Sequence, residues 1–214
     1  MTHYQLTAGV HLAPSPAGAY YAVAGEEREP GRDVLLNIMR RHASEPLEIP
    51  MLERLTGETG DRALACLNRL QAHGLVQGTV QPLRPPAGPL EEVLQALLET
   101  LAPVNGQALL ADDQGLVLSH YGFDEEQAEE LAGMSASLAR LHQRHHRLLG
   151  QSLDLPGSAW ALVGAGGDSK VGFWPLYIHS YRFVLVMRGV PNLNQPALVS
   201  LVWTLVCRYA TNDE

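Results

Sequence analysis

Three histidines in the middle of the chain, His142, His145 and His146, stand at helical positions i, i+3 and i+4. Histidines four residues apart on one face of a helix can bind the same metal ion. No cysteine or carboxylate lies at a useful local spacing, and three arginines surround the group: Arg140, Arg144 and Arg147. Because this positive charge opposes a bound cation, we predict no metal site and interpret the segment as a solvated or interfacial helix end. His145 falls on the apolar stripe of this helix, where its titration would make a contact pH-sensitive.

A glycine-rich stretch from Gly164 to Lys170 has the composition of a phosphate-binding loop. Such a loop needs Gly-Lys-Ser/Thr followed by a helix, because backbone amides and a helix N-terminus hold the phosphates. Here a strand pattern follows the lysine. We therefore interpret this stretch as a hairpin turn.

Two groups of carboxylates have residue types suited to acid–base or metal chemistry. Asp112 and Asp113 lie in a predicted tight turn, and four glutamates lie at the start of a helix, where acids are favoured by the helix dipole: Glu125, Glu126, Glu129 and Glu130. The sequence has no Gly-x-Ser-x-Gly nucleophile elbow, and neither Cys66 nor Cys207 has a suitable local nucleophile context. We therefore predict that the protein is not an enzyme and has no catalytic residue and no cofactor.

The overall composition limits the classes of partner. The 214 residues carry a formal net charge of −8, which argues against strong nonspecific binding to nucleic acid or to an anionic membrane. No apolar run approaches the ~20 residues of a membrane-spanning helix. Met1 to Val10 lacks a cationic start and an apolar segment, so a cytoplasmic location is expected. Lys170 is the only lysine among fifteen basic residues, which suggests a bacterial source.

A proline-rich segment divides the chain. Gln81 to Pro89 holds four prolines in nine residues, and prolines at this density cannot continue a helix or a central strand. We therefore predict an N-terminal domain over residues 1–84, a linker over 85–89 and a C-terminal domain over 90–214.

The N-terminal region has the element order of a winged helix-turn-helix. Two short strands are expected, joined by a turn, then three helices, then a strand entering a wing; the segments are 9–12, 19–24, 33–42, 50–55, 61–73 and 75–80. In a DNA-binding protein of this kind, the helix 61–73 would be the recognition helix. Its outward polar residues able to contact DNA or a protein partner are Arg62, Asn68, Arg69 and His73. However, residues 1–88 hold eight arginines and no lysine against nine acids, about −1 in all, so contact with protein or a structural role is favoured over DNA binding.

The C-terminal region is an α/β pattern with the order αββαβββα. Helices are expected at 90–101, 124–149 and 196–209, and strands at 107–111, 116–120, 158–163, 171–178 and 182–190. Five antiparallel strands with helices on both faces make a three-layer sandwich, an architecture that profilin-like and longin-like domains share.

This order, with these residues, resembles the Roadblock family of dynein-light-chain type. The features that carry the resemblance are the hairpin Gly106–Ser119, the long helix after it, the strand-turn-strand Ser158–Ile178, and Phe183–Met187 followed by Asn192-Leu193 and an apolar helix. The resemblance covers about Pro89 to Ala210. It implies a protein that dimerises by joining sheets edge to edge and packing its long helices together. It also implies, for bacterial members, regulation of a Ras-like small GTPase.

The long helix itself predicts dimerisation. Large apolar residues recur at heptad-like spacing on one stripe: Leu131, Met134, Leu138, Leu141 and Leu148. Beside it lies a stripe of small residues, which lets another helix approach closely, whereas the large stripe suits packing on a sheet. With the edge strand, the predicted dimer interface is Ala128, Ala132, Ser135, Ala139 and Trp160. The alternative is that the alanines are simply good helix formers that face water.

Two functions follow from these patterns. The first is a non-enzymatic homodimeric scaffold that binds a Ras-like small GTPase or another signalling protein. The second is a transcriptional regulator in which the C-terminal domain dimerises two winged helices at a fixed half-site spacing. Both place the protein away from the membrane and without a cofactor.

Overall fold

The computed structural model describes residues 6–27, 29–155 and 157–210. The chain divides into two compact units, and each is described by itself. The first consists of Met1–Ala22, Glu27–Pro86 and Leu198–Glu214; the second consists of Val23–Glu26 and Ala87–Ala197. The limits of the independently folding domains stay a prediction.

The first unit begins with strand β1 (His11–Pro14) and helix α1 (Pro16–Val23). The strand predicted at 19–24 is therefore wrong, because this segment is helical. Ser15 starts the helix: its Oγ accepts a hydrogen bond from the Gly18 N–H at 3.0 Å, and Pro16 suits the first helical turn. Gly18 also packs so closely that a Cβ there would meet the Leu75 carbonyl oxygen at 1.8 Å.

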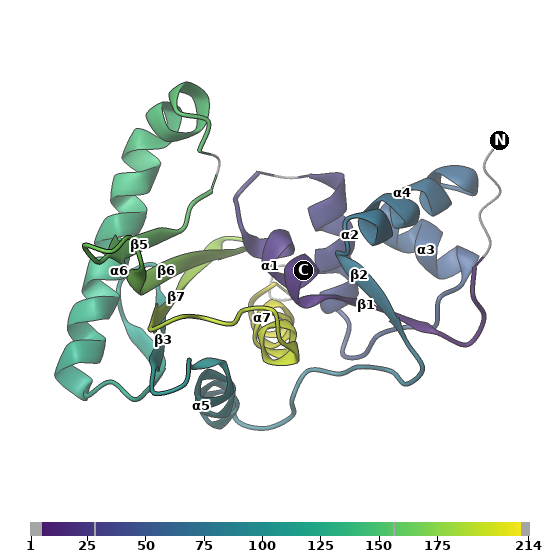
Figure 1. Ribbon diagram of the computed structural model, residues 1–214. Helices are drawn as coiled ribbons and strands as arrows, with labels where there is room; N and C mark the ends of the chain where they lie inside the picture. The colour runs from purple at the N-terminus through teal and green to yellow at the C-terminus, as the bar shows by residue number, and fades with distance from the viewer. Residues whose placement is uncertain (1–5, 28, 156, 211–214) are drawn as a thin grey trace. The chain divides into compact units, whose positions relative to one another are not determined.

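The three helices predicted next are present as α2 (Pro30–Met39), α3 (Ile49–Thr56) and α4 (Asp61–Ala72) (Figure 1). Gly57 ends α3 in the left-handed conformation at φ +69°, and its N–H donates to the Glu53 carbonyl at 2.9 Å. The side chain of Asn37 on α2 donates to the Leu55 carbonyl at 3.1 Å, which ties α2 to the end of α3. Residues 57–60 join α3 to α4, and the two helices pack against each other.

The winged helix as a whole is not confirmed. Strand β2 (Val76–Thr79) follows α4 as expected, but it pairs antiparallel with β1, from His11 opposite Thr79 to Pro14 opposite Val76. Residues 80–89, which would return a wing, contain no strand. One edge of β2 is thus paired with the N-terminal strand, and no second wing strand is present among residues 80–89.

Helix α7 (Pro196–Tyr209) has the limits expected from the sequence, and from Leu198 onwards it belongs to the first unit. Trp203 is 1% exposed, and its indole N–H donates to the Arg41 carbonyl at 2.7 Å. The Cys207 thiol donates to the Met39 carbonyl at 3.1 Å, and burial raises its pKa. These contacts fix α7 against the end of α2.

The second unit is an α–β sandwich in the C-terminal half of the chain. Helix α5 (Leu90–Leu101) leads into β3 (Gln107–Asp112) and β4 (Val117–Tyr121), and then into α6 (Glu125–His146), which a short π-helix (Arg147–Ser152) extends. The last strands are β5 (Trp160–Val163), β6 (Ser169–Ile178) and β7 (Tyr181–Arg188). The αββαβββα order is confirmed when α7 is included.

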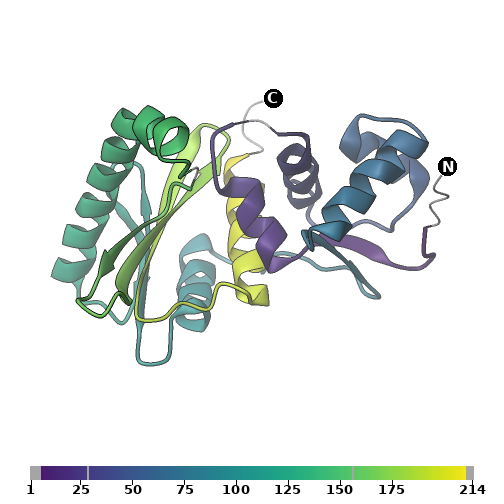
Figure 2. The same ribbon diagram turned by 45° about the horizontal axis from the view of Figure 1, so that its top comes forward.

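The five strands form one antiparallel sheet in the order β4-β3-β7-β6-β5, so β5 and β4 are its edges. Helix α6 covers one face, where its Ala128 and Ala132 pack on Leu109, Phe173 and Val186. Alternate strand residues point to the opposite face, on which α5 packs against β3 and β4. Figure 2 shows α6 and α5 on opposite sides of the sheet.

Two loop residues of the second unit have clear local roles. Gly115, in the turn between β3 and β4, has φ +88°, a conformation that favours glycine. Asp124 caps α6, since its Oδ1 accepts from the Gln127 N–H at 2.8 Å. None of the helices in the described part of the chain is long and apolar enough to cross a bilayer.

Candidate functional site

The centre of the α6 face that packs on the sheet is formed by small residues, whereas the large apolar residues expected there lie at its margin. The small residues are turned inward, with exposures of 1% for Ala128, 0% for Ala132, 1% for Ser135 and 5% for Ala139. Small side chains let a helix lie close to a sheet, so this stripe seats α6 on its own protomer. The Ser135 hydroxyl is satisfied within the helix by donating to the Ala132 carbonyl at 2.7 Å. These four residues are therefore not surface residues of the protomer.

The large apolar residues of α6 form a strip along its flank, which we call the α6 strip: Leu131, Met134, Leu138, Leu141 and Leu148. The first three are half-buried against the edge of the core. Leu141 is 40% exposed and Leu148 is 51% exposed. The strip is only partly covered by the described residues of its own unit, and this leaves apolar surface to water.

Strand β5, at the edge of the sheet, adds further exposed apolar residues to the surface formed by the α6 strip. Its outer edge has no partner strand among the described residues, and Leu162 and Val163 are 52% and 61% exposed. Trp160 is half-buried and packs at the margin of the core beneath α6. An unpaired edge strand beside an apolar helix flank is a surface on which another sheet and helix can pack.

Trp160 also forms a polar contact that sequence reasoning missed. Its indole N–H donates to Nδ1 of His142 at 3.3 Å, and the rings meet edge to face with centroids 6.2 Å apart. Burial, and then the charge of His146, lower the pKa of His142, which favours the neutral ring that can accept this bond. No sequence signal pairs these residues, because they lie 18 positions apart on different elements.

The two histidines that follow His142 on α6 take no part in the contact with Trp160. His145 and His146 are exposed, and Nδ1 of His146 contacts the Gln143 carbonyl at 2.9 Å. Among the residues that the structure describes, no group of three histidine, cysteine, aspartate or glutamate side chains is arranged to hold a metal ion. The Gly164–Lys170 stretch is the turn after β5 together with the first two residues of β6. The Asp168 carboxylate pairs with Lys170 at 2.5 Å, and this contact lowers the pKa of Asp168.

The charges along α6 are divided between its two ends. Its first two turns expose acidic side chains: Glu125, Glu126, Glu129 and Glu130. Its last two turns and the π-helix expose basic ones: Arg140, Arg144 and Arg147. The helix therefore exposes negative charge at its beginning and positive charge at its end.

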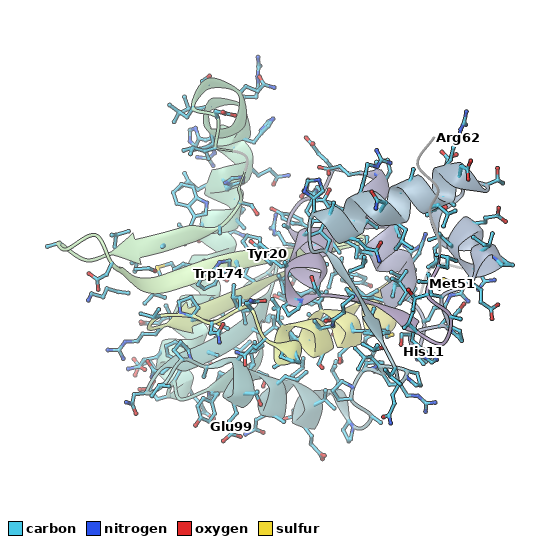
Figure 3. All side chains as sticks on the ribbon, turned by 45° about the vertical axis from the view of Figure 1, so that its right-hand side comes forward. His11, Tyr20, Met51, Arg62, Glu99 and Trp174 are labelled. Atoms are coloured by element: carbon cyan, nitrogen blue, oxygen red, sulfur yellow. The ribbon has the colours of Figure 1, made fainter. Side chains whose placement is uncertain are left out.

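In the first unit, the four polar residues predicted to contact DNA or a partner are all exposed. Arg62, Asn68 and Arg69 lie on α4, and His73 is its C-cap residue. Arg62, labelled in Figure 3, projects from the N-terminal end of α4, and its guanidinium lies 3.8 Å from the Glu58 carboxylate. The sequence correctly identified the outward face of this helix. Contact with DNA or protein there stays a prediction.

Comparison with known proteins finds no matching family model and no matching curated protein. Among solved structures, the chain is similar to a Roadblock/LC7 domain from Streptomyces avermitilis, with 16% identity and a TM-score of 0.34 over 53% of this chain and 87% of that one. It is also similar to Myxococcus xanthus MglB, with 20% identity and a TM-score of 0.32 over 53% of this chain and 78% of that one. A third is MglB with a tetrameric arrangement, with 19% identity and a TM-score of 0.36 over 59% and 96%. The chain is thus similar to Roadblock/LC7 structures, the family that its sequence resembles, over about half of its length.

Proposed function

We propose that this protein is a non-enzymatic homodimeric scaffold that binds and regulates a signalling protein, with a Ras-like small GTPase as the partner. The observation that carries the proposal is the unpaired edge of β5 beside the half-exposed α6 strip. Leu141, Leu162 and Trp160 provide apolar area and an aromatic anchor of the kind that dominates binding energy at interfaces. A second copy covers this surface with the same surface of its own.

The charge distribution on α6 supports an antiparallel pairing of the two helices. In a two-fold dimer the same face of each helix meets its copy. An antiparallel pair brings the acidic turn around Glu126 and Glu130 to the basic turn around Arg140 and Arg144 of the other copy. A parallel pair would bring like charges together and would be disfavoured. The same arrangement lets the two β5 edges meet.

The partner follows from the resemblance to Roadblock proteins, whose bacterial members regulate Ras-like GTPases. The scaffold would act by positioning: a preformed dimer surface binds one conformation of the GTPase better than the other and shifts its population. No residue of this chain needs to enter the nucleotide site. The first unit would then supply specificity for this partner.

Dimerisation is tested first. Light scattering at micromolar concentration should give twice the protomer mass of 23.3 kDa. Leu162→Arg, which places a charge at the β5 edge, should give the protomer mass. Val80→Arg is the matched control, because Val80 is apolar and 83% exposed but lies on the first unit. A monomeric wild type, or equal masses for the two variants, contradicts the dimer.

Partner binding is tested separately with a purified Ras-like small GTPase from the organism that encodes this protein. Pull-down with the wild type should recover that GTPase in one nucleotide state, and GTP turnover should change when the scaffold is added. The Leu162→Arg variant shows whether the dimer is needed. No recovery in either nucleotide state, together with unchanged turnover, contradicts the regulatory role.

A second candidate function is a DNA-binding regulator, favoured by the exposure of Arg62, Asn68 and Arg69 on the second helix of the predicted helix-turn-helix. Side chains of these types can read guanine and adenine edges. The test is a gel shift over a random DNA library at low and high salt, with Arg69→Ala as the variant. Sequence-preferring, salt-sensitive binding that Arg69→Ala weakens would support this candidate, and an absence of binding at low salt would remove it.

A further inference from the structure

A half-open groove of about 390 Å³ lies between the N-terminal half of α6 and the sheet, within the second unit. Its apolar part is lined by Phe123, Leu131, Met134 and Val171. Arg188 and Gln107 form the polar part of the floor. Small-molecule sites of roughly 300–1,000 Å³ with an apolar lining and a few placed polar groups are typical of proteins.

The floor of the groove is set by strand register. Gln107, Arg188 and Val171 lie opposite one another on β3, β7 and β6. Two residues further into each strand, on the same face, is the row that α6 covers: Leu109, Val186 and Phe173. The sheet therefore extends one row beyond the part that the small residues of α6 cover. The groove is this uncovered row.

Arg188 is fixed in position although it is exposed. Its Nη1 donates to Oε1 of Gln107 at 2.9 Å, and Nε2 of Gln107 donates in turn to the Gly122 carbonyl at 2.5 Å. A guanidinium has five N–H donors, so most of them are left for a ligand. No carboxylate pairs with Arg188 in the described part of the chain. The groove thus contains a preorganised cation beside an apolar surface.

We propose that this groove binds a small organic carboxylate with a hydrocarbon or aromatic body. The carboxylate pairs with the Arg188 guanidinium, whose planar fork matches it. The body lies against Phe123, Leu131, Met134 and Val171. This proposal does not rest on the proposed function, because the site is formed within one protomer. Leu131 and Met134 belong to both the groove and the α6 strip, so the ligand and a second copy would compete for these two side chains.

Glu130, on the α6 side of the groove, is the one acid in its lining. It would repel a carboxylate ligand and attract an ammonium ligand, so its influence must be weighed against that of Arg188. Glu130 is exposed and solvated, whereas Arg188 is held by Gln107 on the floor. A carboxylate ligand should therefore gain from Arg188 more than it loses to Glu130. An ammonium ligand would show the opposite dependence on these two residues.

The experiment uses 4-phenylbutyrate as the probe and the labelled methyl group of Met134 as the reporter, assigned with Met134→Leu. Titration of the full chain should give a saturable shift of this signal. The matched probes 4-phenylbutylamine and 4-phenylbutanol have the same body without the negative charge, and they should bind more weakly. Arg188→Gln should weaken phenylbutyrate binding roughly tenfold, in the range for a hydrogen bond to a charged group.

Two further variants separate the site from general charge effects. Glu130→Gln should leave phenylbutyrate binding unchanged or strengthen it. Arg84→Gln removes an exposed arginine from the first unit, outside the groove lining, and should leave binding unchanged. The proposal is overturned if the Met134 signal does not saturate, if Arg188→Gln binds like the wild type, or if the amine binds best and Glu130→Gln weakens it. Urea midpoints of the variants show that each remains folded.

Discussion

Helices α6 and α7 differ in where their large apolar side chains lie. From Leu201 to Val206, α7 is buried on all sides, including Trp203 and Thr204. In contrast, α6 buries a stripe of small residues and leaves its leucines half-exposed or exposed. A helix that is apolar all round is buried in the protein, whereas a helix with surplus large apolar residues beside its buried face has a surface for a partner. The size of the side chains, and not only their polarity, distinguishes the two.

The largest expected effect is on α7. Trp203→Ala removes a fully buried ring and should lower the free energy of unfolding by about 3–5 kcal/mol. Trp203→Phe keeps most of the volume but removes the indole donor, so the Arg41 carbonyl keeps only the longer contact with the Cys207 thiol at 3.6 Å, and the variant should cost about 1–3 kcal/mol. Urea unfolding followed by circular dichroism measures both. A loss below about 1 kcal/mol for the alanine variant would mean that α7 is not core, and the contrast with α6 would fail.

Substitutions at two neighbouring positions on α6 should change the free energy of unfolding in opposite directions. Ala132 is 0% exposed against the sheet, so Ala132→Leu should overpack the contact and cost about 1–3 kcal/mol. Next to it, Gly133 is exposed with open space around the site of a Cβ, so Gly133→Ala should stabilise the protein by about 0.5–1 kcal/mol. The measurement is the urea midpoint of each variant. Equal effects would show that the small residues do not face the sheet.

Charge reversal tests the antiparallel helix pair. Glu130→Arg and Arg144→Glu should each weaken the dimer a few-fold, since exposed ion pairs contribute about 0.2–1 kcal/mol. The double variant should recover affinity, because the opposite charges face each other again. Sedimentation at low and high salt measures the dissociation constants. Single and double variants that weaken the dimer additively would argue against this register.

The smallest expected effect concerns pH and His142. The pKa of His142 is lowered in the folded protein, so folding favours the neutral ring. The stability that this ring contributes is fully present above the ordinary pKa of 6.5, and it is lost as the pH falls from 6.5 towards the lower pKa of the folded state. Unfolding free energy should therefore decrease between about pH 7.5 and about pH 5.5. His142→Gln should reduce this slope, with His145→Gln as the control on the exposed face. A slope unchanged in His142→Gln would mean that the Trp160 contact does not select the neutral ring.

The sequence predicted most of the second unit because its elements have strong local patterns. Leu90–Leu101 and Pro196–Tyr209 were predicted with the limits that the structure has, since apolar spacing and flanking prolines define them. The segment 19–24 was misread because its helix depends on a Ser15 cap and on packing of Gly18 against distant Leu75. The facing of α6 was misread because alanine fits both a close sheet contact and a helix contact.

The site was less predictable than the fold. The exposed residues of α4 follow from helical spacing alone. The contact of Trp160 with His142 and the row formed by Gln107, Arg188 and Val171 depend on strand register and on tertiary packing. Register is set by pairing across the whole sheet, and no short segment of the sequence encodes it. These features therefore require the structure.

The division of the first unit has a consequence for synthesis of the protein. Its helices α1 to α4 are complete by residue 72, but the Arg41 and Met39 carbonyls bind side chains that are made some 160 residues later. Since chains emerge from the ribosome N-terminus first, this unit cannot complete its packing until α7 has been translated. A fragment that stops at Pro86 would lack the Trp203 ring. During translation, the second unit can therefore finish most of its sheet before the first unit reaches its final state.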